Sequence, residues 1–205
     1  MTAALFAGLL AGYGIAVPVG AVGTYLVALT ARTSLRIGAC AALGVATADG
    51  LYALIAQIGG SALAHAIHPV LTPLRWTSAA VLLALAIRGA VLALRSHRTS
   101  APVDESSPPT PARAYFTLWA VTMMNPLTVI YFAALVIGAQ GESAPDHLDE
   151  AVFVAAAFVA SASWQLFLAL SGALLGRVLT GARGRLATAL GSSALIAFLA
   201  LRLLT

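Results

Sequence analysis

The chain of 205 residues has no lysine and only one cysteine, and charged residues make up 9% of it. The single Cys40 excludes an intramolecular disulfide and a pair of redox-active thiols. All eleven basic residues are arginines without interleaved aromatic side chains, so we do not expect nucleic-acid binding. The four histidines lie near predicted loops. His65 and His68 are three residues apart, but no carboxylate or cysteine lies close to them in sequence, so we interpret them as interfacial polar residues and expect no bound metal and no other cofactor.

Apolar residues dominate the remainder of the composition. They make up 60% of the chain, and its mean hydropathy is +0.95. A soluble globular domain is typically about 45–50% apolar and about 25% charged, so this balance indicates a chain surrounded by lipid. The N-terminal stretch has no basic residue before its apolar run, and we interpret it as the first membrane helix rather than as a cleaved signal.

Six hydrophobic stretches are long enough to cross a membrane as helices, which requires about 20 residues each. They extend over Ala4–Leu29, Ile37–Ile58, Val70–Leu94, Tyr115–Gly138, Ala151–Leu175 and Leu186–Leu204. The sequence therefore predicts an all-α integral membrane protein with six transmembrane helices.

The connection after the third stretch, residues 96–113, is rich in proline and serine and lacks apolar periodicity. Such a composition predicts a flexible linker. It separates a first three-helix repeat at 1–95 from a second at 114–205. Because three is an odd number, the second repeat enters the membrane from the opposite side, as in an inverted-topology repeat.

The charges of the connections predict the orientation of the chain. Arginines gather in the first, third and fifth connections, whereas residues 140–150 carry four acidic residues and no arginine. Since positively charged loops remain in the cytoplasm, we expect the 96–113 linker inside the cell and both termini outside.

Both repeats begin with a helix that proline interrupts. The first interruption contains Pro18 and Gly20, and the second is Asn125-Pro126. Proline breaks or kinks a helix, and irregular backbone within a membrane is tolerated where protein or a water-filled cavity surrounds it. Asn is a favoured N-cap and Pro a favoured first helical residue, so Asn125-Pro126 predicts a new half-helix whose amino end could face an anion. A simple structural kink is the alternative.

Asp49 is the only acidic residue within the six stretches. A carboxylate near the bilayer centre costs about 2.5–3.5 kcal/mol on insertion scales, so such residues usually face a cavity or a partner. A structural ion pair with Arg88 is the alternative. At 1.5 Å per residue, Pro18, Asp49, Pro126 and Ser163 all fall near the bilayer midplane, with Trp164 beside Ser163. Core packing is the alternative for Trp164.

The order of these motifs resembles the LysE/RhtB family of amino-acid exporters over essentially the whole chain. The family's Pro-Gly-Pro corresponds to Pro18-Val19-Gly20, its Gly-Asp segment to residues 48–52 and its Asn-Pro-Lys to Asn125-Pro126-Leu127. Its Trp-bearing fifth helix corresponds to Ser163-Trp164. Gly20 replaces the family's second proline, and Leu127 replaces a lysine.

The resemblance implies a secondary transporter of the bacterial inner membrane that exports amino acids or related small metabolites and is coupled to protons, not an enzyme. We expect the substrate site at Pro18, Gly20, Asp49, Asn125, Pro126, Ser163 and Trp164, with Asp49 also as the proton-coupling residue. An exporter of another solute such as a metal ion, and a non-transport membrane assembly subunit, are the alternatives. A homo-oligomer is left open.

Overall fold

The computed structural model describes residues 1–98, 109–138, 147–178 and 182–202, and these ranges contain helices and no strand. Most of the predicted linker, residues 99–108, lies outside the described residues, and so do the side chains of His65 and His68. The all-helical prediction is therefore confirmed for the described part of the chain.

Both predicted helix interruptions are present. The first stretch consists of α1 (Thr2–Ala16) and α2 (Ala21–Arg32), which are bent by 74° at the break that contains Pro18. The fourth stretch consists of α4 (Pro111–Met123) and α5 (Pro126–Gly138). In each case the proline cannot donate the backbone hydrogen bond that a continuous helix requires.

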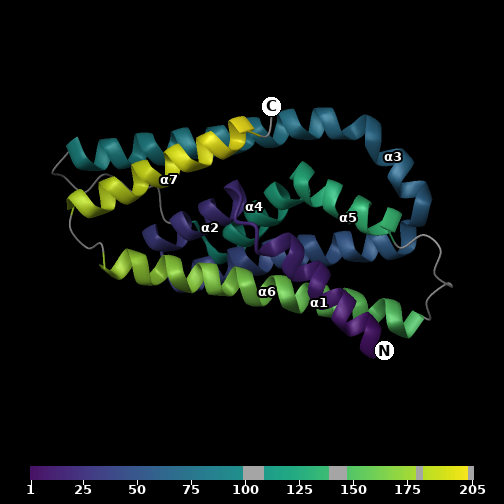
Figure 1. The fold of residues 1–205 in the computed structure, drawn as a ribbon. Helices are drawn as coiled ribbons and strands as arrows, with labels where there is room; N and C mark the ends of the chain where they lie inside the picture. The colour runs from purple at the N-terminus through teal and green to yellow at the C-terminus, as the bar shows by residue number, and fades with distance from the viewer. Residues whose placement is uncertain (99–108, 139–146, 179–181, 203–205) are drawn as a thin grey trace.

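The second and third predicted stretches are not separate helices. The helix α3 (Leu35–Arg98) is continuous through the residues that we expected to form a loop, and it turns back on itself in Figure 1. Gly59-Gly60, Pro69 and Pro73 lie within α3 and are the kinds of residue that bend a helix without ending it. The chain is completed by α6 (His147–Val178) and α7 (Ala182–Arg202).

Two segments of the described residues are individually long and apolar enough to cross a membrane, Leu35–Ile58 and His147–Gly176. The bent pair of α1 and α2 forms a third if it counts as one span. The return part of α3 contributes the shorter apolar segment Trp76–Arg88. The described helices thus establish a helical protein with apolar spans, whereas six separate spans remain a prediction.

The packing of the helices joins the two halves of the chain. α1 and α2 both pack on α6, whereas α4 and α5 both pack on α3. In Figure 1, α7 lies along the return part of α3, and α1 crosses α6. The broken helices of each half therefore pack on the long helix of the other half.

Glycines allow the closest of these crossings. A side chain at Gly12 of α1 would overlap the Ala157 carbonyl oxygen of α6, and one at Gly44 of α3 would overlap the Tyr115 carbonyl oxygen of α4. Small residues bring helix backbones into direct contact, which is how helices associate in lipid without a hydrophobic driving force.

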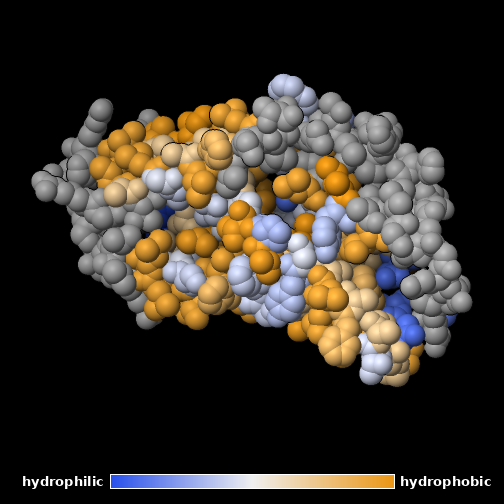
Figure 2. Space-filling view, viewed as in Figure 1, coloured by the Kyte–Doolittle hydropathy of each residue, from blue (hydrophilic) through white to orange (hydrophobic). Residues whose placement is uncertain are grey.

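The surface is apolar and the interior consists largely of alanine. Phe6, Leu10, Ile58 and Phe167 are more than half exposed, and the described residues on the face seen in Figure 2 are mostly hydrophobic. Asp49 is the only ionisable side chain among the described buried residues. An exposed apolar surface of this extent fits a lipid environment.

Candidate functional site

Asp49 lies in the first part of α3 and faces the interior of the bundle. Its side chain is 3% exposed, and the Ser161 hydroxyl of α6 donates a hydrogen bond to Oδ2 at 2.6 Å. Ser161 itself is fully buried. The contact therefore connects the two halves of the chain at the one buried carboxyl group among the described residues.

The alternative that Asp49 pairs with Arg88 does not agree with the structure. Arg88 is exposed, and the ion pairs among the described residues are Met1 with Asp149 and His147 with Glu150. A buried carboxylate without a counter-ion is costly, and a single hydroxyl compensates only part of that cost. Asp49 is thus a polar group for which the described protein supplies one hydrogen bond and no cation.

Asn125 caps the half-helix α5, as its residue type predicted. Its Oδ1 accepts a hydrogen bond from the Leu127 amide at 3.2 Å, and its Nδ2 donates to the Thr128 hydroxyl at 3.1 Å. The Thr128 and Val129 amides both donate to the Asn125 carbonyl. The first amides of α5 are therefore already bonded within the helix end, and Leu127, in the position of the family's lysine, is about half exposed.

The amino end of α2 differs from that of α5. Its N-cap is Gly20, which has no side chain that could accept a hydrogen bond from the first amides of the helix. The first backbone hydrogen bond of α2 joins the Thr24 amide to the Gly20 carbonyl. A side chain built on Gly20 would meet nothing within 4 Å, so there is open space beside this helix end. Pro18 in the preceding break is exposed.

Ser163 lies two residues after Ser161 but faces another direction, because two residues rotate a helix by about 200°. Its hydroxyl donates to the Ala160 carbonyl at 2.8 Å and lies 2.9 Å from the Tyr13 hydroxyl of α1. The structure thus brings Ser161, rather than Ser163, to Asp49. The sequence marked a polar cluster on this helix without indicating which serine faces inward.

Trp164 is half-buried and packs on Phe167, with ring centroids 5.4 Å apart. Its indole Nε1 belongs to a set of four buried side-chain atoms without a hydrogen-bond partner in the described structure. The other three are Ser78 Oγ, Thr122 Oγ1 and Gln165 Oε1. Native proteins rarely leave buried polar groups unpaired, so these atoms suggest bound water or a polar ligand inside the bundle.

Ser78 and Thr122 are residues that sequence reasoning missed. A serine or threonine within an apolar stretch gives no distinct signal, because its hydroxyl can bond to the preceding turn of its own helix. Thr30 does so through the Leu26 carbonyl, whereas the Thr122 hydroxyl does not.

The described residues contain no group of three or more His, Cys, Asp or Glu side chains that could hold a metal ion. An open groove of about 660 Å³ lies between α3 and α6, and Asp49 is not among its lining residues. In this conformation Asp49 is closed off from that space.

Comparison with known protein families gives a match to the family model described as LysE type translocator, over residues 14–205. Comparisons with curated proteins and with solved structures give no match. The matched range includes every residue of the candidate site.

Proposed function

Because the chain belongs to the LysE type translocator family, which moves small solutes across membranes, we propose that it exports amino acids or related metabolites in exchange for protons. The observation that carries this proposal is the buried Asp49 carboxyl group, bonded across the two halves to Ser161. A carboxyl group in a membrane interior is typical of substrate sites and proton relays.

An inverted repeat is supported by the reciprocal packing of the halves. If α1 and α2 correspond to α4 and α5, and the first part of α3 corresponds to α6, then the contacts of each half mirror those of the other. The breaks at Pro18 and at Asn125-Pro126 then occupy equivalent places. Transporters of this design bind their substrate at the interface of the repeats.

We assign different tasks to the two ends of a zwitterionic substrate. The Asp49 carboxylate is suited to bind the ammonium group, or to carry the coupling proton when the substrate is absent. The uncapped amino end of α2 at Gly20 is better suited to the substrate carboxylate than α5, whose first amides Asn125 already engages. Trp164 and Ser163 of α6 then line the path of the substrate through the bundle.

Alternating access requires the halves to move relative to one another. Rocking of α3 against α6 would separate Ser161 from Asp49 and open the closed interior toward one side of the membrane. In the orientation that the arginine distribution predicts, with both termini outside the inner membrane, the fourth connection lies at the outlet.

The proposed function is tested by efflux from proteoliposomes loaded with a panel of radiolabelled amino acids, under an imposed proton gradient. Asp49→Asn is expected to abolish efflux of every substrate that the unaltered protein exports. Asp149→Asn, which removes a partly exposed acidic group at the start of α6, is the matched control and should retain efflux. Undiminished efflux by Asp49→Asn would exclude the assigned site.

A further inference from the structure

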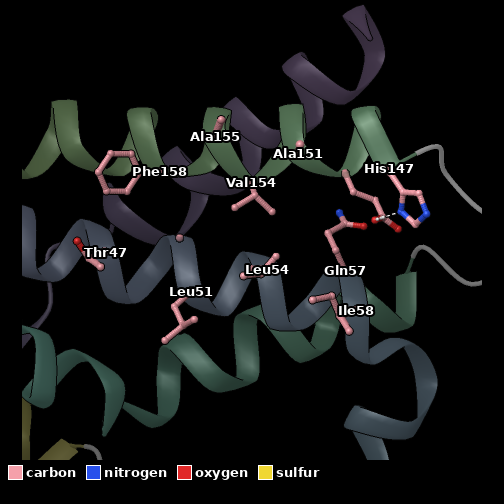
Figure 3. A pocket seen from close by; sticks show the side chains of 12 residues that line it. Thr47, Leu51, Leu54, Gln57, Ile58, His147, Ala151, Val154, Ala155 and Phe158 are labelled. Carbon is pink, nitrogen blue, oxygen red and sulfur yellow. Dashed lines mark hydrogen bonds and ion pairs between the residues drawn. The ribbon is translucent and has the colours of Figure 1, made fainter.

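An open groove of about 660 Å³ lies between α3 and α6, on the flank of the bundle (Figure 3). Most of its lining is apolar, and Leu54 and Ala155 within it are exposed. Its volume is within the range of about 300–1,000 Å³ that is typical of small-molecule sites. The apolar lining consists of Gly50, Leu51, Leu54, Ile58, Ala151, Val154, Ala155 and Phe158.

The amide and ionisable side chains of the groove all lie at one end. Figure 3 shows Gln57 and His147 together at one end, and Thr47 and Phe158 toward the other. Glu150, one turn after His147, also lines the polar end, and its Oε2 lies 3.4 Å from His147 Nδ1. The lining of the groove is therefore complementary to an amphipathic ligand that has an apolar body and a polar head.

The two helices that form the walls of the groove indicate that it lies within the membrane. They belong to the two segments that are individually able to cross a membrane, Leu35–Ile58 and His147–Gly176. The polar end lies where both segments end or begin, which is the level of the lipid headgroups, and the apolar part lies deeper. A groove in this position faces acyl chains rather than water.

The charge at the polar end favours a cationic head. Asp149 and Glu150 both lie in the first turn of α6. Asp149 is already paired with the N-terminal ammonium group at 2.6 Å, whereas the described partner of Glu150 is His147. The full negative charge of Glu150 exceeds the roughly half unit of positive charge at a helix amino end. His147 Nε2 has no partner in the described structure, and in the protonated imidazolium it donates to a phosphate while Nδ1 donates to Glu150.

We propose that this groove binds one phospholipid with a primary ammonium headgroup, as in phosphatidylethanolamine. An acyl chain lies along Leu51, Leu54 and Val154, the ammonium group donates hydrogen bonds to Glu150, and the phosphate lies beside His147. The proposal concerns a site outside the translocation path and does not depend on the transported solute.

The test is native mass spectrometry of the full-length protein, released from micelles that contain equimolar phosphatidylethanolamine and phosphatidylglycerol with identical acyl chains. The unaltered protein is expected to retain one phosphatidylethanolamine, with at least a fivefold preference over phosphatidylglycerol. Leu54→Trp fills the groove and should reduce retention at least fivefold. Leu43→Trp is the matched control, because Leu43 lies on α3, is similarly exposed and does not line the groove.

The head contact is tested by Glu150→Gln, which keeps the size of the side chain and removes its charge. This variant should still retain a lipid but lose the preference for phosphatidylethanolamine. Equal retention of both lipids by the unaltered protein would overturn the proposal, and so would equal retention by Leu54→Trp and Leu43→Trp. A species of twice the mass that Leu54→Trp abolishes would also overturn it, because a second copy of the chain would then occupy the groove.

Discussion

The hydrogen bond between Ser161 and Asp49 gives a quantitative test of the proposed movement of the halves. Its 2.6 Å length and full burial are those of a charge-assisted bond, which contributes about 1.5–3 kcal/mol. If the bond exists only in the closed conformation, Ser161→Ala shifts the equilibrium toward the open one by about 10- to 140-fold, since 1.4 kcal/mol is tenfold.

The change in the population of the open conformation is measured by thiol labelling of the variant Thr122→Cys. Thr122 is 2% exposed and is closed off in this conformation. The native Cys40 is replaced by alanine so that one thiol remains. Because the labelling rate of a buried thiol is proportional to the open population, Ser161→Ala should raise that rate by at least about tenfold. Efflux of the exported amino acids should change in the same preparations, because one of the two conformations is then depleted.

Ser171→Ala is the matched control on the same helix, since the described bond of the Ser171 hydroxyl stays within that helix and joins it to the Phe167 carbonyl one turn earlier. It should leave labelling and efflux unchanged. The reasoning is refuted if Ser161→Ala labels the Thr122 cysteine within twofold of the control, because the bond would then contribute equally to both conformations.

Three other local contacts lead to predictions for the purified protein. Gly12→Val should greatly reduce the monodisperse fraction in size-exclusion chromatography, because its side chain overlaps a carbonyl oxygen of α6; a normal elution profile would contradict the packing. Asn125→Ala should lower the free energy of unfolding by about 1 kcal/mol through loss of the α5 cap, and Asn125→Asp by less, as denaturant titration would show. Asp149→Asn should lower the free energy of unfolding by under about 1 kcal/mol, because the ion pair with Met1 is partly exposed. This loss of stability should become smaller at high salt.

Hydropathy predicted the helical class, and proline placement predicted both helix breaks. Apart from the breaks at Pro18 and Asn125-Pro126, where a backbone donor is missing, the described residues of the apolar stretches lie in helices. The helix between Ile58 and Val70 was not predicted, because glycine and proline indicate a bend or an end equally well in sequence. The residue types of this segment allow either a bend or a helix end, and the packing of the folded chain determines which of the two occurs.

The burial of Asp49 was predictable from the sequence, whereas the directions of the neighbouring side chains were not. Asp49 is buried, as a lone carboxyl group in an apolar stretch suggests, yet its partner is Ser161 rather than Ser163 or Arg88. In an alanine-rich helix the apolar residues cover every face, so periodicity does not identify which serine points inward. The closure of Asn125 on its own helix end likewise depends on a side-chain rotamer that residue type alone does not specify.

The crossing of α1 over α6 has a consequence for biosynthesis. Tyr13 meets Ser163, which is 150 residues later in the chain, so the glycine face of α1 has no native partner when it leaves the ribosome. At about 5–20 residues per second, α6 follows roughly 8 to 30 s later. During that interval the insertion machinery or lipid must shield the nascent first half. For the same reason, neither half is expected to form a stable unit when expressed alone, whereas the two halves expressed together as separate polypeptides should assemble.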